Sequence, residues 1–244
     1  MVARRETMIH ALAIALFAVL AEPDYSAWSV LLHKYYDPAK GMNYAALKAH
    51  DERALEAIRL QLGRVDVSAL SARQQLAYWI NVYNVNVVAT VVEHYPVRSI
   101  RDISTDPIIR LNVFKKERVP FGGAKISLDD VENARIRTAF HDPRIHFAIN
   151  CAAKSCPPIR MEPYGGDRID VQLDDQVRRF LRSTVRFERK GDTMVIHVSR
   201  ILDWFNDDFG DKLAFLRRYV SVTPASKTEF KYDDYDWSLN DWRR

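Results

Sequence analysis

The chain has 244 residues, of which 48% are hydrophobic and 28% are charged, with only eight Gly and ten Pro. This ordinary globular composition excludes collagen-like, low-complexity and wholly disordered proteins. Lys and Arg number 36 against 32 Asp and Glu, which gives a net charge of +4. The basic residues form no run of the kind that marks nucleic-acid binders, so we expect no nucleic acid partner. Two cysteines are too few for a disulfide-rich scaffold.

The first 21 residues have the pattern of a secretory signal peptide. Arg4 and Arg5 precede the apolar run Ala11–Ala21, which is about half the length that crosses a bilayer. Small residues near its end complete the signal pattern, although an N-terminal core helix is the alternative. We expect residues 22–244 to be periplasmic or secreted, without an integral membrane anchor and with cysteines open to oxidation.

Residues 22–244 contain no internal repeat and no linker, so we expect one domain with a short N-terminal helical extension. The longest expected helix starts at a capping box of Ser71 and Gln74 and ends at His94. It is apolar nearly all round, which predicts a buried central helix, although its β-branched second half is also compatible with a strand. In chain order, the expected helices are 27–36, 51–62, 71–94, 127–140 and 173–181, with one or two more over 201–219.

Strand patterns lie between these helices. We expect a hairpin at 113–126 turning at Gly122–Gly123, and another at 185–198 turning at Gly191–Asp192. Apolar and polar residues alternate over Arg144–Asn150, which predicts a strand. Mixed helices and antiparallel hairpins around a buried helix indicate an α+β fold rather than a parallel sheet.

The strong catalytic and cofactor motifs are absent. The chain has no phosphate-binding loop, no dinucleotide glycine motif, no His-Glu-x-x-His and no Gly-x-Ser-x-Gly. Two cysteines without a His at finger spacing do not predict structural zinc, so we expect neither metal nor cofactor. The segment of interest is His146–Arg160, where the expected strand leads into a polar loop with two cysteines.

In the first of four interpretations of this loop, a cysteine is the nucleophile, His146 its base and Glu132 the acid that orients the imidazole. Lys154 or Arg160 would lower the pKa of the thiol. On an extended strand, residues 146 and 151 would lie roughly 16 Å apart, at about 3.3 Å per residue. A direct contact therefore needs a sharp turn after Ala148, or a base from elsewhere, with His94 the next candidate.

The second interpretation is a disulfide between Cys151 and Cys156, which would shape the loop more than stabilise the fold. In the third, both cysteines pack as small hydrophobic residues. In the fourth, His146 and a cysteine bind a metal.

Asn81 and Asn84 lie three positions apart on one face of the expected central helix, where buried amides need partners. They either form a structural network that holds loops or present one amide to an active cleft. Met161, Trp204 and the Tyr and Trp residues near the C-terminus are interpreted as core.

Four motifs in order resemble the DUF547 family, a domain of unknown function whose bacterial members are often exported. They are Tyr78–Asn84, Ile126–Glu132, Asp142–Cys151 with Lys154–Pro158, and Tyr235–Asn240. The resemblance runs from about residue 44 to 240. The most distinctive family positions match Asn81, Asn84, Glu132, His146 and Cys151.

The resemblance implies a cysteine-hydrolase-like site on a papain- or transglutaminase-like core. Cys151 would attack an amide or peptide-like bond, His146 would shuttle the proton and Glu132 would hold the imidazole. A small-molecule or peptide-like substrate would contact residues from the central helix and the cysteine loop: Asn81, Asn84, Asn150, Lys154, Ser155 and Arg160. The alternative is a non-catalytic envelope binding module with a loop stapled by Cys151 and Cys156.

Overall fold

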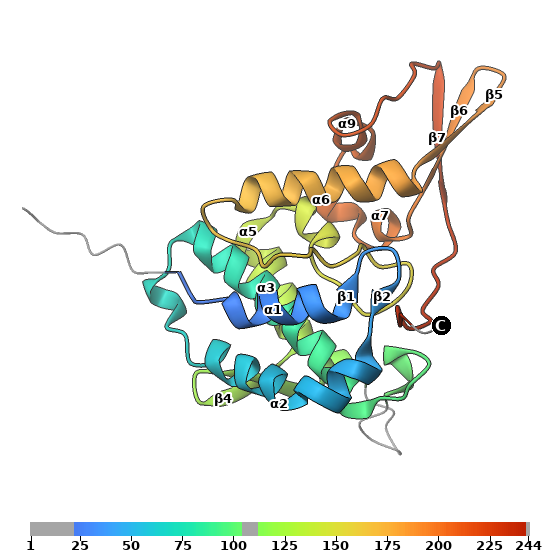
Figure 1. Cartoon of the computed structure of the whole chain (residues 1–244). Helices are drawn as coiled ribbons and strands as arrows, with labels where there is room; N and C mark the ends of the chain where they lie inside the picture. The colour runs from blue at the N-terminus through green and yellow to red at the C-terminus, as the bar shows by residue number, and fades with distance from the viewer. Residues whose placement is uncertain (1–21, 104–111, 243–244) are drawn as a thin grey trace, which may run out of the picture.

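Helix α3 (Ala72–His94) runs through the middle of the computed structural model, which describes residues 22–103 and 112–242 (Figure 1). The expected signal segment lies outside these ranges. The Ser71 hydroxyl accepts from the Gln74 N–H and the Gln74 side chain accepts from the Ser71 N–H, so the predicted capping box is confirmed. Every residue from 76 to 92 is buried. The β-branched second half of the segment is helical because a fully buried site overrides its weak strand preference.

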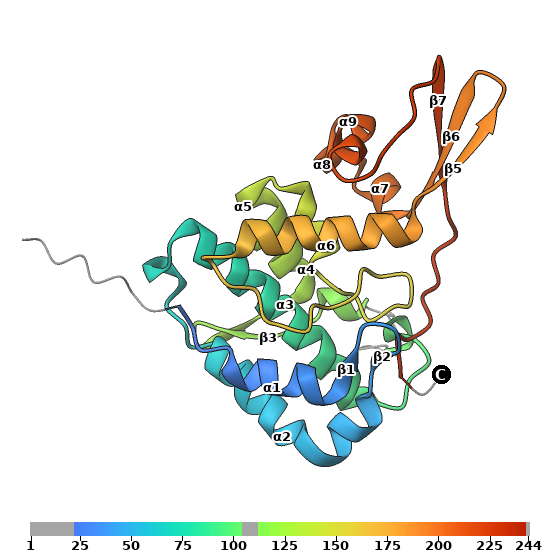
Figure 2. The ribbon, with the colours of Figure 1, turned by 45° about the horizontal axis from the view of Figure 1, so that its top comes forward.

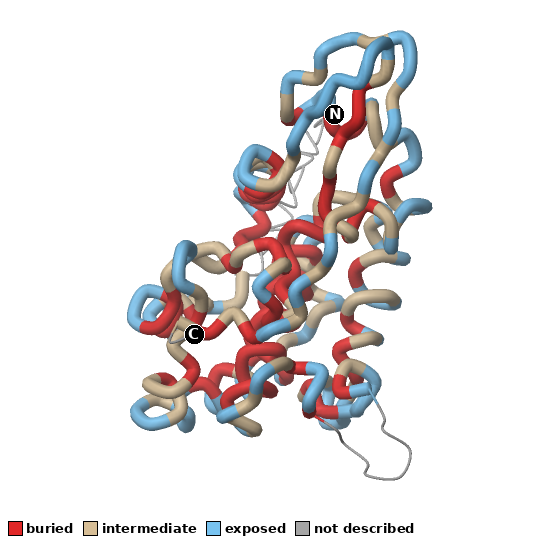
Figure 3. Tube along the Cα trace, turned by 90° about the vertical axis from the view of Figure 1, so that its right-hand side faces the viewer, coloured by how far each residue is buried: buried red, intermediate tan, exposed pale blue. Residues whose placement is uncertain are grey.

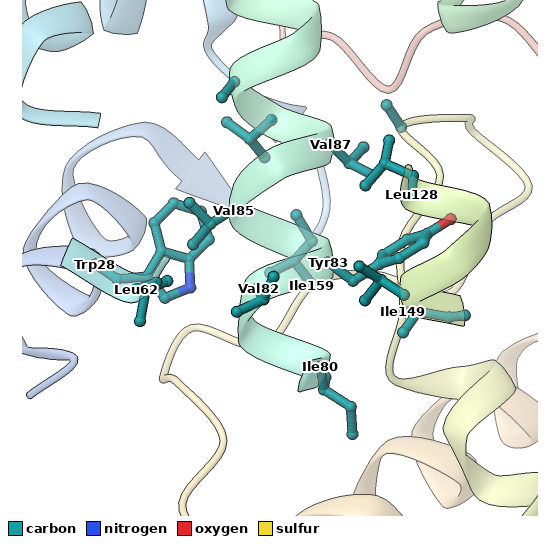
Figure 4. Packing of buried hydrophobic residues seen from close by; sticks show 14 of the residues in the cluster. Trp28, Leu62, Ile80, Val82, Tyr83, Val85, Val87, Leu128, Ile149 and Ile159 are labelled. Carbon is teal, nitrogen blue, oxygen red and sulfur yellow. The ribbon is translucent and has the colours of Figure 1, made fainter. Parts of the chain in front are cut away.

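Two helices cover one side of α3. Trp28 from α1 (Ser26–Tyr35) and Leu62 from α2 (Tyr44–Leu62) lie on that side, and Leu128 and Ile149 lie on the other (Figure 4). Helix α2 begins seven positions before the predicted start, with a non-helical Asp51 inside it. The two helices are joined by a short ladder, β1 (Tyr36–Asp37) and β2 (Gly41–Met42).

The predicted hairpin at Gly122–Gly123 forms as the antiparallel pair β3 (Glu117–Phe121) and β4 (Ala124–Ser127). The predicted helix 127–140 is a continuous helical stretch, but its middle is π-helical. Its three parts are α4 (Leu128–Asp130), the π-helical segment η4 (Val131–Arg137) and α5 (Thr138–Phe140). Short 3₁₀ helices lie before these elements: η1 (Val67–Ala69), η2 (Ile100–Asp102) and η3 (Val113–Lys115).

The predicted strand at Arg144–Asn150 is wrong. Its first part belongs to the 3₁₀ helix η5 (Pro143–Phe147), and the Asp142 side chain caps this helix by accepting from the Arg144 N–H at 2.9 Å. Residues 145–150 are all buried, so the alternation of apolar and polar residues does not separate an inner face from an outer one.

The second half of the chain builds a smaller core beside α6 (Ile169–Thr184) (Figure 2). The predicted hairpin at Gly191–Asp192 is present, and a third strand that the sequence analysis missed pairs with it in parallel. The sheet consists of β5 (Arg186–Lys190), β6 (Thr193–Val198) and β7 (Lys227–Tyr232). Between β6 and β7 lie three short helices: α7 (Ile201–Trp204), α8 (Asn206–Phe209) and α9 (Lys212–Arg217).

After β7 the chain returns to the larger core, and we call residues 235–242 the C-terminal strap. The Lys154 N–H donates to the Ser238 carbonyl at 2.9 Å, and the Asn240 N–H donates to the Ala152 carbonyl at 2.9 Å. The Met42 N–H also donates to the Asn240 carbonyl at 2.9 Å. Buried residues fill the centre of the molecule, whereas β5 is exposed throughout (Figure 3).

The strap links segments from both ends of the chain, and the protein is a single α+β domain, as predicted. None of the helices described is both long and apolar enough to span a bilayer.

Candidate functional site

A cleft of about 370 Å³ opens where η4, the loop after η5, the α7–α8 region and the C-terminal strap meet. One wall consists of aromatic rings, with the Tyr235 centroid 4.7 Å from that of Trp204 and 4.8 Å from that of Trp237. Trp204 is 47% exposed. The sequence analysis placed these three aromatic residues in the core, and the cleft corrects that interpretation.

Cys151 and Cys156 line the cleft as a disulfide, the second of the four interpretations of the loop. The Tyr235 hydroxyl lies 3.3 Å from Cys151 Sγ and donates to Cys156 Sγ at 3.0 Å. The Cys151 N–H also donates to Cys156 Sγ at 3.0 Å. In this oxidised form neither cysteine can act as a nucleophile, because that reaction needs a free thiolate.

Glu132 reaches the cleft from the π-helical segment η4. π-Helical turns recur at functional sites, where they change the direction in which a side chain projects. Burial raises the pKa of the Glu132 carboxyl to about 7, against the opposing effects of the Tyr83 hydrogen bond and the Arg137 charge. The Tyr83 hydroxyl donates to Glu132 Oε2 at 3.2 Å. Near neutral pH this carboxyl is therefore present in both protonation states.

The sequence analysis expected Glu132 to hold the imidazole of His146. In the structure, His146 pairs with Asp208 instead. Nε2 lies 2.6 Å from Asp208 Oδ2, and the ring stacks on Phe205 with centroids 3.9 Å apart. Burial lowers the pKa of His146 to about 4, although Asp208 acts in the opposite direction. The imidazole is thus neutral at pH 7, with Nε2–H donating to Asp208. Nδ1 is then an acceptor, and it is buried with no hydrogen-bond partner among the residues described.

Arg137 holds the other side of Asp208. Its Nε and Nη2 donate to the two Asp208 oxygens at 2.7 and 3.0 Å, and this fork is the main cause that lowers the pKa of Asp208. His146 and Arg137, which line the cleft, are therefore joined through the ionised carboxylate of Asp208, which does not line it.

The central-helix amides have structural partners, and neither lines the cleft. Asn84 Nδ2 donates to the Ala148 carbonyl at 2.9 Å, and its Oδ1 accepts from the Asn150 N–H at 2.9 Å. Asn81 makes the same two-way contact with the backbone of Tyr164, at 2.8 and 3.0 Å. Both amides hold loops against α3, and one of these is the loop that enters the cysteine segment.

The other predicted substrate contacts also lie outside the cleft. Asn150 Nδ2 donates to the Pro157 carbonyl at 2.7 Å, which braces the disulfide loop. Arg160 forms ion pairs with acidic residues near α6, Lys154 is exposed, and Ser155 Oγ accepts from a backbone N–H of the strap. Among the residues that the structure describes, the Lys or Arg that lines the cleft is Arg137, not Lys154 or Arg160. His94, the alternative base, does not line it either.

The sequence analysis missed Tyr83, which lines the cleft, and Asp208, which binds the cleft residues His146 and Arg137 without lining the cleft itself. Tyr83 lies inside the Tyr78–Asn84 motif, one position before Asn84. Asp208 lies in the short helix α8, where no periodicity marks it. In the described residues, no group of three or more His, Cys, Asp and Glu could hold a metal ion.

A family model described as "Protein of unknown function, DUF547" matches residues 67–181. This range is narrower than the resemblance from residue 44 to 240. It contains Glu132, His146 and the disulfide, but neither Asp208 nor Tyr235. No curated protein and no solved structure matches the chain.

Proposed function

Through residues 67–181 the chain belongs to the DUF547 family, whose function is unknown, and we propose that it is a binding module for a peptide-like ligand. The cleft is the binding site, and the Cys151–Cys156 disulfide staples its wall. The observation that carries this proposal is that both candidate nucleophiles are bonded to each other at the cleft.

The chemistry of the cleft favours a planar ligand with an amide group. Trp204 and Trp237, with centroids 5.8 Å apart, offer exposed ring surface on which an aromatic or peptide plane can stack. A carboxyl with a pKa of about 7, such as Glu132, can donate to a carbonyl or accept from an N–H. Ligand sites typically combine apolar walls with a few convergent polar groups.

The first test is a count of free thiols in the purified full chain by alkylation without reductant and mass spectrometry. If the chain is a binding module, both cysteines should be protected from alkylation.

The second test is a titration with N-acetyl-phenylalaninamide, which should change the fluorescence of the cleft tryptophans and saturate. Trp204→Ala should weaken this binding, whereas Phe187→Ala, which removes an exposed ring outside the cleft, should leave it unchanged. Two free thiols, or equal binding by both variants, would reject the proposal.

The His146–Asp208 pair favours a second function, a thiol-dependent hydrolase or transferase that works after a dithiol has reduced the disulfide. His146 Nδ1 would take the Cys151 thiol proton, and the thiolate would attack the carbonyl carbon of an amide. The amine would leave with that proton, and water or an acceptor amine would then cleave the thioester. Glu132, beside Tyr83, would donate to the carbonyl oxygen.

This second function is tested with the reduced chain and a fluorogenic amide or ester. Reduced wild type should release the fluorophore, while Cys151→Ser and His146→Ala should not. Oxidised wild type is the matched control. Turnover that persists in Cys151→Ser would assign the activity to a contaminant or to another site.

We also propose that residues 1–21 are a secretory signal and that the mature chain is periplasmic or secreted. Arg4, Arg5 and the run Ala11–Ala21 support this proposal, and a cleft disulfide suits an oxidising compartment. N-terminal sequencing of the fractionated protein should give a mature start near Glu22. A chain that retains Met1 in the cytoplasm would refute export.

A further inference from the structure

A second hollow, of about 910 Å³, lies between α2, the C-terminal end of α3 and the β3–β4 hairpin. It shares no lining residue with the cleft, and we call it the arginine groove. The Gly122 N–H donates to the Gly63 carbonyl at 3.0 Å, so the hairpin is fastened to the end of α2. A Cβ at Gly63 would lie 2.7 Å from the Pro120 carbonyl oxygen. The walls of the groove are therefore in close contact and fixed.

Arg118, on β3, is the unusual residue of this groove. Its side chain is 8% exposed, yet Nε and Nη1 have no hydrogen-bond partner among the residues described. The Glu93 carboxylate lies 3.7 Å from Nη1, beyond hydrogen-bond distance. A buried donor without an acceptor is destabilising and calls for an explanation such as an ion or a water.

The neighbouring Arg59 shows that acceptors are available at this place in the fold. Its Nε donates to Asn86 Oδ1 at 2.9 Å, its Nη1 to Glu56 at 2.5 Å and its Nη2 to the Arg118 carbonyl at 2.8 Å. Arg59 is thus bonded within the protein and holds the β3 backbone. The bond from Arg59 fixes the main chain of Arg118, whereas Nε and Nη1 of the Arg118 guanidinium have no acceptor among the residues described.

The charges around the groove favour an anion. Its lining includes six Lys and Arg but only four Glu. Of those Glu residues, Glu56 is paired with Arg59 and Glu93 lies beside Arg118. Four further cations line the groove with no ion pair in the part of the chain that the structure describes: Arg53, Arg64, Lys116 and Lys125. A hollow with an excess of one charge raises the local concentration of the opposite ion.

We propose that the arginine groove binds an organic oxyanion, whose carboxylate or phosphate oxygens accept from Arg118. Guanidinium groups suit such oxygens because their hydrogen bonds are charge-assisted. The volume leaves room for an organic body beyond the anionic group. This site is independent of the cleft and of the redox state of the cysteines.

The test uses the full chain and two probes, inorganic phosphate and acetate, with sodium chloride at matched ionic strength as the blank. Binding is followed by calorimetry and by the ¹H–¹⁵N signals of arginine Nε groups. We expect saturable binding, with a shift of the Arg118 signal. The probe that binds more tightly identifies the anionic group as phosphate or carboxylate.

Three variants make the test specific. Arg118→Gln should weaken binding by about tenfold or more, since hydrogen bonds to charged groups are the strong ones. Glu93→Gln removes an exposed competing carboxylate and should tighten binding by about two- to fivefold. Arg182→Gln removes one exposed positive charge outside the groove and should leave the affinity unchanged.

The Glu93→Gln variant keeps the proposal falsifiable if Arg118→Gln does not fold, because the Glu93 side chain is 61% exposed. The proposal is overturned if wild type responds to phosphate and acetate no more than to chloride. It is also overturned if Glu93→Gln binds no more tightly than wild type, or if a folded Arg118→Gln binds with wild-type affinity.

Discussion

Replacing Glu132 by Gln should stabilise the protein above neutral pH and leave it unchanged in acid. The folded-state pKa of this carboxyl is about 7, against an ordinary value of 4.5. As the pH rises, the unfolded chain therefore releases its proton first, and folding stability falls between these two values. A difference of about 2.5 units between the folded and unfolded pKa values corresponds to about 3 kcal/mol of folding stability. This contribution is present in acid and fully lost above pH ~7.

Gln keeps the shape of the side chain, and its carbonyl oxygen can still accept from Tyr83, so the substitution removes the ionisation and little else. Glu132→Gln should exceed wild type in the free energy of unfolding by up to about 3 kcal/mol at pH 8 and by about zero at pH 4.5. His146 acts in the opposite direction, because its lowered pKa removes stability as the pH falls from 6.5 through about 4. Since both proteins contain His146, its contribution cancels in the difference.

The assay is urea denaturation of the oxidised proteins, followed by circular dichroism at pH 4.5, 6 and 8. Glu52→Gln is the matched control, because Glu52 is exposed and forms no ion pair among the residues described. Its difference from wild type should be near zero and independent of pH. If the advantage of Glu132→Gln is the same at every pH, burial does not perturb Glu132 and the cleft lacks a carboxyl that titrates near neutrality.

Three further predictions concern the surroundings of the cleft. Asn84→Ala should destabilise the fold by about 2 kcal/mol or more in urea, because it leaves a buried backbone carbonyl and a buried N–H without partners; a loss below about 0.5 kcal/mol would contradict this account. In histidine proton NMR, His146 should stay neutral down to about pH 4, and Asp208→Asn should lower its pKa further, because the carboxylate opposes the effect of burial; titration near 6.5 in wild type would be inconsistent with a buried ring. In the reduced protein, Tyr235→Phe should slow the alkylation of Cys156 at pH 7 by roughly fivefold, since it removes from the sulfur a hydrogen bond of about 1 kcal/mol that would stabilise the reactive thiolate; an unchanged rate would show that the hydroxyl leaves this sulfur on reduction.

The sequence predicted the larger core well because local signals and burial agree there. The capping box at Ser71 and Gln74 marks the start of α3, and its unbroken apolar character marks its place at the centre. Both hairpins were found from their glycine turns, where a positive φ at Gly122, Gly123 and Gly191 is required. Strand β7 was missed, although its residues alternate between exposed and half-buried positions.

The site was predicted only in part because its partners are set by tertiary contacts. The sequence brought attention to Glu132, His146 and the cysteines, and all of them line one cleft. Pairing His146 with Glu132 was wrong, since Asp208 arrives from a helix of four residues that carries no sequence pattern. The alternation at Arg144–Asn150 favoured a strand, whereas Asp142 and Pro143 together start a 3₁₀ turn. Because the segment turns instead of extending, the strand-based separation of residues 146 and 151 does not apply.

The C-terminal strap makes the order of chain synthesis relevant to the site. Tyr235 and Trp237 complete a cleft whose other groups come from residues 83 to 205, and the strap also bonds to Met42 and Ala152. During synthesis the chain emerges from its N-terminus, whereas a single domain folds as a unit. Both cysteines therefore leave the ribosome some eighty residues before the tyrosine that covers their sulfurs. In that interval the pair lacks the shield of Tyr235, so oxidation of the thiols can precede closure of the site.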